Sequence, residues 1–179
     1  MPIEANYKTY YGIHLNHYST SWGGNTYHKI LVTEFPDSNL VSTDTTNTSS
    51  ADFLYPRLIT NKAYLDGVAE GHITIYNNGS SATTVTNFSV SLKKTDDVPS
   101  NETVLGSYTA NISSDNSVPS SGYLTLPFYM PIDKQTLDEN EKLIFHVEYT
   151  SDSSDLCIAH ANDSSNIDIK IKVPYAPVG

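Results

Sequence analysis

The sequence predicts an all-β protein: an antiparallel β-sandwich of the jelly-roll type with an N-terminal arm, or alternatively an immunoglobulin-like sandwich. The composition is the first observation behind this prediction. The 179 residues include 22 Ser, 19 Thr and 15 Asn, which compete with helical hydrogen bonds or, as with Thr, suit a pleated surface. The second is a period of two in apolar residues, interrupted by turn-forming clusters and giving about eight or nine strands. No stretch has the apolar spacing of a helix.

The alternation is clearest in the last two-thirds of the chain. The segments that carry it are residues 72–76, 84–93, 104–112, 123–131, 143–149 and 167–173. In the last of these, all the apolar residues point one way, so a slip of one position would expose every one of them and the register should be fixed. We expect this strand to end at Pro174. Pro127 has no amide proton, which predicts that its strand lies at a sheet edge or ends there.

Residues 143–149 form the strongest predicted strand, and Ile144 on its second face predicts partial burial on both sides. The acidic turn at 137–142 that precedes it resembles a corner of jelly rolls. Cys157 lies in another apolar segment and is interpreted as a small buried hydrophobic residue.

The first third of the chain is less regular. Residues 7–18 and 27–35 are predicted strands, 42–52 an exposed Ser/Thr/Asn-rich loop, and 53–65 a short helix or strand. We expect one domain overall. Residues 1–65 would supply the arm and first strands, packed on the same domain or on neighbours, and 66–179 the main sandwich.

Charge narrows the range of partners. There are 10 Lys+Arg against 20 Asp+Glu, a net charge of −10, which disfavours nucleic acid because phosphates would be repelled. No run of apolar residues is long enough for a membrane helix, so no membrane partner is expected. The first residues lack the basic and apolar regions of a secretory signal, so such a signal is absent or was removed before residue 1, and synthesis in the cytoplasm is expected.

Catalytic motifs are absent from the sequence, and we predict neither an enzyme nor a cofactor. There is no G-x-S-x-G, P-loop or G-x-G-x-x-G pattern. His14 and His17 would point to opposite faces of a strand, and no H-x-H occurs that could form a jelly-roll metal site. No catalytic residue is therefore assigned.

Two polar loops, residues 151–155 and 160–166, flank the segment that contains Cys157. Their oxygen-bearing side chains make Asp152, Asp155 and Asp163 candidates for calcium ligands. The loops lack EF-hand spacing, and ordinary polar turns are the favoured alternative.

Aromatic residues are concentrated at the start of the chain and are the candidates for an interface. Tyrosine offers apolar area with a polar tip and is enriched at interfaces. Core packing, a protein interface and a sugar-stacking platform all remain open for this group: Tyr7, Tyr10, Tyr11, Tyr18, Trp22 and Tyr27.

Residues 71–174 resemble β-sandwich virion proteins of tailed viruses of bacteria or archaea, which decorate capsids or build head fibres and tail parts. The alternating strands at 72–76, 124–130, 143–149 and 167–173, with polar turns between them, carry the resemblance. It implies a non-enzymatic virion structural protein, foremost a capsid decoration or minor head protein. Its partners would be the major capsid protein or neighbouring subunits. It would be a homo-oligomer, with a trimer suited to three-fold lattice sites. The alternative is a carbohydrate-binding or adhesive module of a virion fibre or cell surface.

Overall fold

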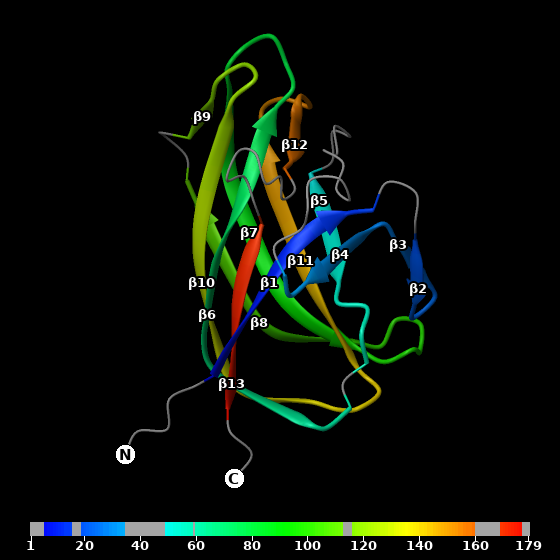
Figure 1. The fold of residues 1–179 in the computed structure, drawn as a ribbon. Coiled ribbons are helices and arrows are strands. Elements are labelled where there is room, and N and C mark those ends of the chain that lie inside the picture. The colour runs from blue at the N-terminus through cyan, green and yellow to red at the C-terminus, as the bar shows by residue number, and fades with distance from the viewer. Residues whose placement is uncertain are drawn as a thin grey trace.

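The computed structural model describes residues 6–15, 19–34, 49–58, 60–112, 116–159 and 169–176. Over these residues the chain is built from strands and contains no helix, which confirms the predicted all-β class (Figure 1). Accordingly, no described helix has the length and hydropathy needed to cross a membrane.

Thirteen strands lie within the described residues. In chain order they are β1 Asn6–His14, β2 Thr20–Trp22, β3 Asn25–Tyr27, β4 Lys29–Val32, β5 Ser50–Leu54, β6 Ala63–Asn77, β7 Thr83–Thr95, β8 Glu102–Asn111, β9 Ser117–Val118, β10 Tyr123–Leu137, β11 Lys142–Ser151, β12 Leu156–Ile158 and β13 Lys170–Ala176.

One large sheet contains eleven of these strands, and its main path runs β10-β6-β13-β1-β4-β5-β11-β7-β8. Strands β12 and β9 attach to β6 and β7. The sheet curls until its two terminal strands, β8 and β10, lie beside each other, so that it nearly closes into a barrel (Figure 1). This architecture is compatible with the β-sandwich and jelly-roll class. All pairings in it are antiparallel except that of β4 with β5.

The core lies between the inward faces of this curved sheet, and alternation places it there. In β10, Leu126, Phe128 and Met130 are buried and alternate with exposed residues. The ring of Phe128 packs 5.5 Å from that of Phe145 on β11, measured between centroids. In β13, Ile171 and Val173 are fully buried, as the predicted register required.

Strand β11 is buried on both faces at Ile144, as predicted. The reason is the hairpin of β2 and β3, which packs on the outside of the sheet. Tyr27 from this hairpin forms a small cluster with Ile144 and Leu54, and Trp22 packs against it. The outer cluster therefore covers a patch that a single-layered sheet would leave in water.

Two local predictions are wrong, and the structure decides between the alternatives of a third. The predicted loop at 42–52 is wrong for residues 50–52, which belong to β5 and pair with β11; residues 42–48 lie outside the described part. Of the helix or strand predicted at 53–65, the strand is confirmed at both ends, by the end of β5 and the start of β6, and no helix occurs among the described residues of this segment. Pro174 does not end the last strand, because a register shift between Lys172 and Tyr175 accommodates it.

Pro127 lies in the terminal strand β10, which confirms the predicted edge position, although the strand continues to Leu137.

The first described strand, β1, lies inside the sheet between β13 and β4. Tyr10 and Leu31 from this part of the chain join the same core cluster as Phe53.

Candidate interaction surface

The outward face of β10 and its neighbour β6 carries an aligned group of exposed aromatic and proline side chains. Because β10 alternates strictly from residue 123 to residue 132, one row of its side chains points into the core and the other points outward. We call the outward row and its β6 neighbours the tyrosine–proline face. Its members are Tyr123, Thr125, Pro127, Tyr129 and Pro131 of β10, paired with Tyr76, Thr74, His72, Glu70 and Val68 of β6, of which Thr74 is buried and Tyr76 and His72 are half-buried.

The exposed fractions on this face are high for apolar side chains. Tyr129 is 62% exposed, Tyr123 47% and Val68 43%. The Tyr123 ring lies 4.8 Å from that of Tyr76, and the Tyr129 ring lies 5.1 Å from that of Tyr108 on β8. Partial burial raises the pKa of Tyr123, so this phenol stays neutral at physiological pH. The rings are thus held side by side with one surface open.

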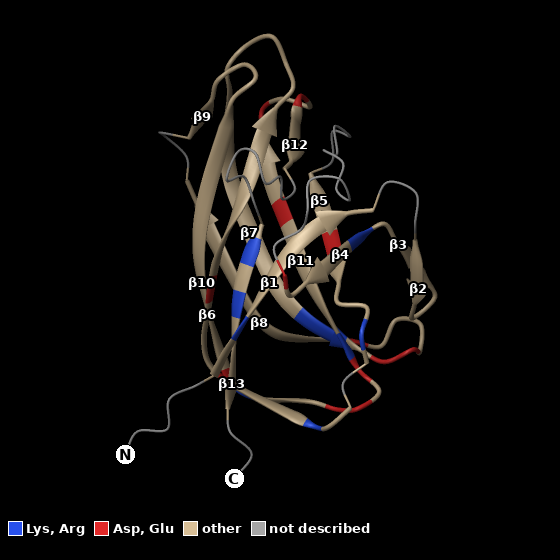
Figure 2. Cartoon of the chain, viewed as in Figure 1, with Lys and Arg blue, Asp and Glu red and all other residues tan. Residues whose placement is uncertain are grey.

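Formal charge is almost absent from this face, although the chain carries −10 overall. Between Tyr123 and Ile132 no β10 residue is ionisable as an acid or base apart from the tyrosine phenols, and Glu70 is the one carboxylate among the paired outward residues of β6. In Figure 2 most of β10 is drawn without charge, whereas coloured segments appear on β5, β11 and β13. A negatively charged partner could approach here with little repulsion.

The two prolines determine how a partner can bind to β10. Pro127 and Pro131 have the same parity along the strand, so both remove amide donors from the same side. The amide of Asn77 on β6 bonds to the carbonyl of Gly122, so the even residues of β10 face β6 and the missing donors of the two prolines belong to the edge that faces β8. Addition of a foreign strand at that edge is therefore disfavoured, and binding through side chains on the face is favoured.

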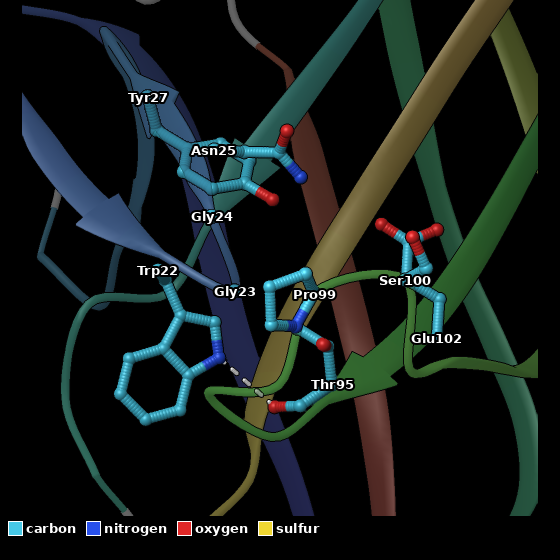
Figure 3. A pocket seen from close by; sticks show the side chains of 9 residues that line it. All are labelled: Trp22, Gly23, Gly24, Asn25, Tyr27, Thr95, Pro99, Ser100 and Glu102. Atoms are coloured by element: carbon cyan, nitrogen blue, oxygen red, sulfur yellow. Dashed lines mark hydrogen bonds between the residues drawn. The ribbon is translucent and has the colours of Figure 1, made fainter.

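A second feature surrounds Trp22 on the hairpin (Figure 3). Its indole Nε1 donates a hydrogen bond to the Thr95 carbonyl at 3.0 Å, and the amide of Gly23 donates to Asp97 Oδ1 at 2.9 Å. These bonds tie the hairpin to the connection between β7 and β8. A cleft of about 420 Å³ lies between the two segments, and its lining includes Asn25 and Glu102.

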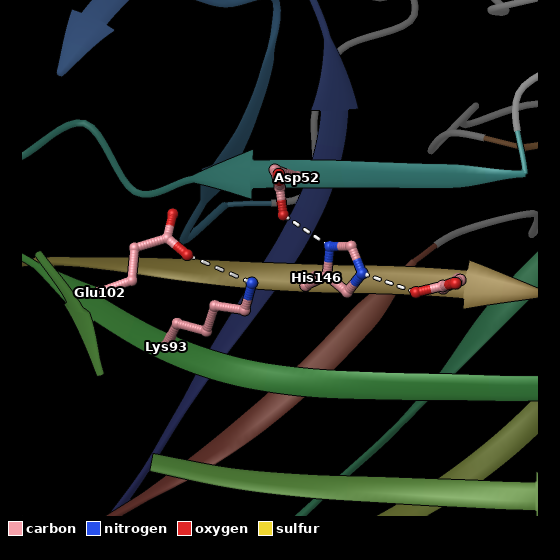
Figure 4. A network of polar contacts seen from close by, with 5 residues as sticks. Asp52, Lys93, Glu102 and His146 are labelled. Atoms are coloured by element: carbon pink, nitrogen blue, oxygen red, sulfur yellow. Dashed lines mark hydrogen bonds and ion pairs between the residues drawn. The ribbon is translucent and has the colours of Figure 1, made fainter. Parts of the chain in front are cut away.

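A polar network lies on the outside of β5, β11 and β7 (Figure 4). His146 Nδ1 lies 2.7 Å from Asp52 Oδ1, and its Nε2 lies 3.2 Å from Glu148 Oε2. Hydrogen bonding to Asp52 raises the pKa of His146, with Glu148 adding to the effect; burial and Lys93 oppose it. Lys93 itself pairs with Glu102 at 3.3 Å.

This network contains a histidine and carboxylates, as many catalytic sites do, but its hydrogen bonds differ from those of a catalytic triad. Both ring nitrogens of His146 face carboxylates, which favours the imidazolium form and leaves no nitrogen to accept a proton from a nucleophile. The arrangement instead links β5 to β11, whose residues are far apart in the sequence.

The predicted interface residues at the start of the chain are dispersed. Tyr10 is 2% exposed and Tyr27 is 7% exposed, so both pack in buried clusters. Trp22 and Tyr11 are half-buried, and Tyr7 is 50% exposed at the start of β1. Tyr18 lies outside the described residues. Among the described members, Trp22 and Tyr27 lie together in the outer cluster, and the structure does not join them with Tyr7, Tyr10 and Tyr11 in one surface.

The calcium candidates are engaged in local hydrogen bonds where they are described. Asp152 Oδ1 accepts a bond from Thr83 Oγ1 at 2.9 Å and another from the Thr84 amide at 3.2 Å. Asp155 Oδ2 accepts from Ser153 Oγ at 3.2 Å. Asp163 lies outside the described residues. In the part of the chain that the structure describes, no three His, Cys, Asp or Glu side chains are grouped to hold a metal ion.

The sequence-based interpretation missed the tyrosine–proline face. The period of two in β10 predicts its inward row, whereas nothing in that period marks the outward row as exposed. A signal was present: two prolines and two tyrosines at odd positions from 123 to 131 make both rows of one strand largely apolar. Such a strand is either covered on both sides or presents an apolar surface.

No protein-family model matches this chain, and no curated protein matches it in sequence. Solved structures resemble its fold. A CocE/NonD family hydrolase from Staphylococcus aureus superposes with a TM-score of 0.60 at 12% identity, covering 99% of this chain and 37% of the hydrolase. An aminopeptidase from a marine sediment archaeon (Thaumarchaeota) gives 0.55 at 8% identity, covering 73% of this chain and 26% of the aminopeptidase.

The Eiger TNF of S. frugiperda aligns over 97% of this chain and 95% of its own at 11% identity, but its TM-score of 0.42 is too low to show a shared fold. The chain spans little more than a third of the hydrolase and about a quarter of the aminopeptidase. At these identities the two likenesses show a shared β fold and nothing about activity.

Proposed function

We propose that this chain is a non-enzymatic structural protein of a virus particle, foremost a capsid decoration or minor head protein. It binds the capsid lattice or neighbouring subunits through the tyrosine–proline face. The observation that carries the proposal is that exposed Tyr123 and Tyr129 stand on a nearly uncharged face of a chain with a net charge of −10. Tyrosine and low charge are typical of the centres of protein interfaces.

The charge distribution supports assembly through this face. Two copies of the chain, or a copy and another acidic shell protein, repel each other wherever carboxylates meet. On the tyrosine–proline face Glu70 alone would oppose contact among the paired outward residues, and Tyr129 lies directly opposite it across the strands. The acidic remainder of the surface would keep assembled particles apart in solution.

In this proposal the partners are the major capsid protein or further copies of the chain, and the location is the virion. A homo-oligomer, such as a trimer at a three-fold lattice site, would bury the face between copies. The proposal involves neither nucleic acid nor a membrane as a partner, because the exposed tyrosines of a nearly uncharged face suit contact with another protein.

A carbohydrate-binding or adhesive module is the second candidate, and the cleft beside Trp22 favours it. Asn25 and Glu102 supply polar groups there, next to the aromatic side chains of Trp22 and Tyr27. Sugars are bound by such combinations of ring faces and amide or carboxylate groups. Against this candidate, Trp22 is itself bonded to Thr95 and packed in the outer cluster, so its ring is not a free platform.

The test is sedimentation of the purified protein with particles from its native source. The double variant Tyr123→Ser/Tyr129→Ser should no longer sediment with the particles, because the apolar contact is lost. Val98→Ser is the matched control, since Val98 is 55% exposed in the connection between β7 and β8, and it should sediment as the unaltered protein does. Unchanged sedimentation of the double variant would overturn the proposal.

Glycan binding distinguishes the second candidate. Asn25→Ala removes a polar group from the Trp22 cleft at an exposed position and leaves the tyrosine–proline face untouched. If the chain is a glycan-binding module, this variant loses binding on a glycan array while sedimentation is unaffected. Retained glycan binding by Asn25→Ala would remove support for the cleft as the site.

A further inference from the structure

A cleft of about 490 Å³ lies at the end of the sheet where β1 begins, β13 ends and the β5–β6 connection passes. It is separate from the tyrosine–proline face and from the Trp22 cleft. Its volume is within the range of small-molecule sites. Aromatic residues, cations and uncharged polar side chains all contribute to its lining.

Tyrosines form a fixed group at this cleft. The hydroxyls of Tyr10 and Tyr175 lie 2.7 Å apart, and the rings of Tyr10 and Tyr55 meet edge to face with centroids 5.0 Å apart. Tyr10 is buried, whereas Tyr55 and Tyr175 are half-buried and Tyr64 is 38% exposed. The last three therefore offer partly open rings anchored by the core beneath them.

Cations are concentrated at the same cleft. Lys8, Arg57 and Lys62 line it, three of the ten Lys and Arg residues in the chain, and Arg57 is the only arginine. Of the described residues that line the cleft, none is acidic, although acids outnumber bases two to one overall. The local charge is thus opposite to that of the protein as a whole.

These cations have little internal neutralisation. The Nζ of Lys62 lies 3.4 Å from Asp138, but both side chains are about half exposed, and such a pair contributes little. Within the described residues, Lys8 and Arg57 form no ion pair; Lys8 instead places its ammonium 4.8 Å from the centre of the Tyr175 ring. Arg57 can therefore offer its planar guanidinium to an external anion.

We propose that this cleft binds an acidic saccharide, whose carboxylate or sulfate group pairs with Arg57, Lys8 and Lys62 and whose ring packs on the tyrosines. The hydroxyl of Thr60 and the amide of Asn61, which also line the cleft, supply hydrogen-bonding groups for sugar hydroxyls. A bare anion would not need the aromatic surface, and a neutral sugar would not need three cations. This site does not depend on the proposed function.

Isothermal titration calorimetry of the full chain at low salt tests the proposal with four probes of matched length or charge. These are a galacturonic acid tetramer, a sulfated glucose tetramer, a neutral glucose tetramer and a tetraglutamate peptide. We expect one-to-one binding of one or both acidic saccharides, weakening as salt is added. The preferred probe then distinguishes the carboxylate from the sulfate. The neutral tetramer and tetraglutamate should each bind at least about tenfold more weakly, because each lacks one part of the recognition.

Variants then locate the site. Arg57→Gln should weaken binding of the preferred saccharide by about tenfold or more, and Tyr64→Ser should weaken it without changing its salt dependence. Lys172→Gln is the control of equal charge, because Lys172 lies on β13 outside this cleft, and it should leave affinity unchanged. The proposal is overturned if no acidic saccharide binds, if tetraglutamate binds equally well, or if Lys172→Gln weakens binding as much as Arg57→Gln.

Discussion

The ammonium of Lys142 lies 4.0 Å from the centre of the Trp22 ring, on the outside of the sheet. Lys142 is only 8% exposed, and this burial lowers its pKa while the carboxylate of Asp97 opposes the shift. The indole thus covers a nearly buried cation and, through Nε1, holds the Thr95 carbonyl. Trp22 therefore fastens the β2–β3 hairpin to the sheet.

Replacing Trp22 should accordingly destabilise the fold. Trp22→Ala uncovers Lys142 and Ile144 and is expected to lower the free energy of unfolding by about 2 kcal/mol. Trp22→Phe keeps a smaller aromatic ring but loses the hydrogen bond to Thr95, and it should cost less than Trp22→Ala, about 1 kcal/mol. Urea denaturation followed by circular dichroism measures both values. Equal stability of Trp22→Ala and the unaltered protein would mean that the ring is a free platform after all.

The His146 network should make stability depend on pH. The pKa of His146 is raised above 6.5 in the folded protein, chiefly by Asp52. Its stabilising contribution is therefore complete below the unfolded value and is lost as pH rises through the folded value. Because the side chain is 22% exposed and Lys93 opposes the shift, the contribution is expected to be at most about 1 kcal/mol.

Denaturation at about pH 6 and about pH 8.5 checks this expectation. The free energy of unfolding should fall between the two values, and His146→Gln should reduce the fall. His28→Gln, at an exposed position in the connection between β3 and β4, serves as the control and should keep the full dependence. A fall of equal size in His146→Gln and the unaltered protein would show that the network does not titrate as described.

Strands whose burial follows from their own residue pattern are predictable from the sequence, whereas strands defined by distant partners are not. The inward rows of β10 and β13 were predictable, because a period of two with large apolar residues has one favourable register. Strand β5 was not predictable. Ser50 and Asp52 face outward and are polar, so this segment resembles a loop unless its pairing with β11 is known. The contact between Asp52 and His146 was unpredictable for the same reason, because the two residues are 94 positions apart in the sequence.

The candidate surface was harder to predict than the fold. Clustering of tyrosines near the N-terminus does not reveal exposure: Tyr7 and Tyr10 lie three residues apart in one strand, yet one is half exposed and the other is buried. Exposure follows from which neighbours cover each strand face. The tyrosine–proline face depends on β10 being terminal and on its outward row being uncovered, both of which are properties of the sheet order.

Asp152 should act as a structural acceptor and not as a calcium ligand. Hydrogen bonds from Thr83 and Thr84 lower its pKa, so its stabilising effect is present above the ordinary value of 3.8 and is lost as pH falls below it. Asp152→Asn is expected to lower the urea midpoint at neutral pH, with a smaller difference at about pH 3. Asp155→Asn, the neighbouring control, should have a lesser effect.

A calcium chelator should leave the melting temperature of the unaltered protein unchanged in the same series. A lower melting temperature after chelation, restored by added calcium and absent from Asp152→Asn, would instead assign the loop a bound ion.

Hydroxyl-radical footprinting of the protein, free and assembled on its native particle, examines the tyrosine–proline face most directly. Mass spectrometry would follow oxidation of Tyr123 and Tyr129, with exposed Tyr7 and Val98 as internal references. We predict that oxidation of Tyr123 and Tyr129 falls several-fold on assembly while the two references change little. Equal oxidation of Tyr129 in the free and assembled protein would contradict the proposal that this face binds the partner.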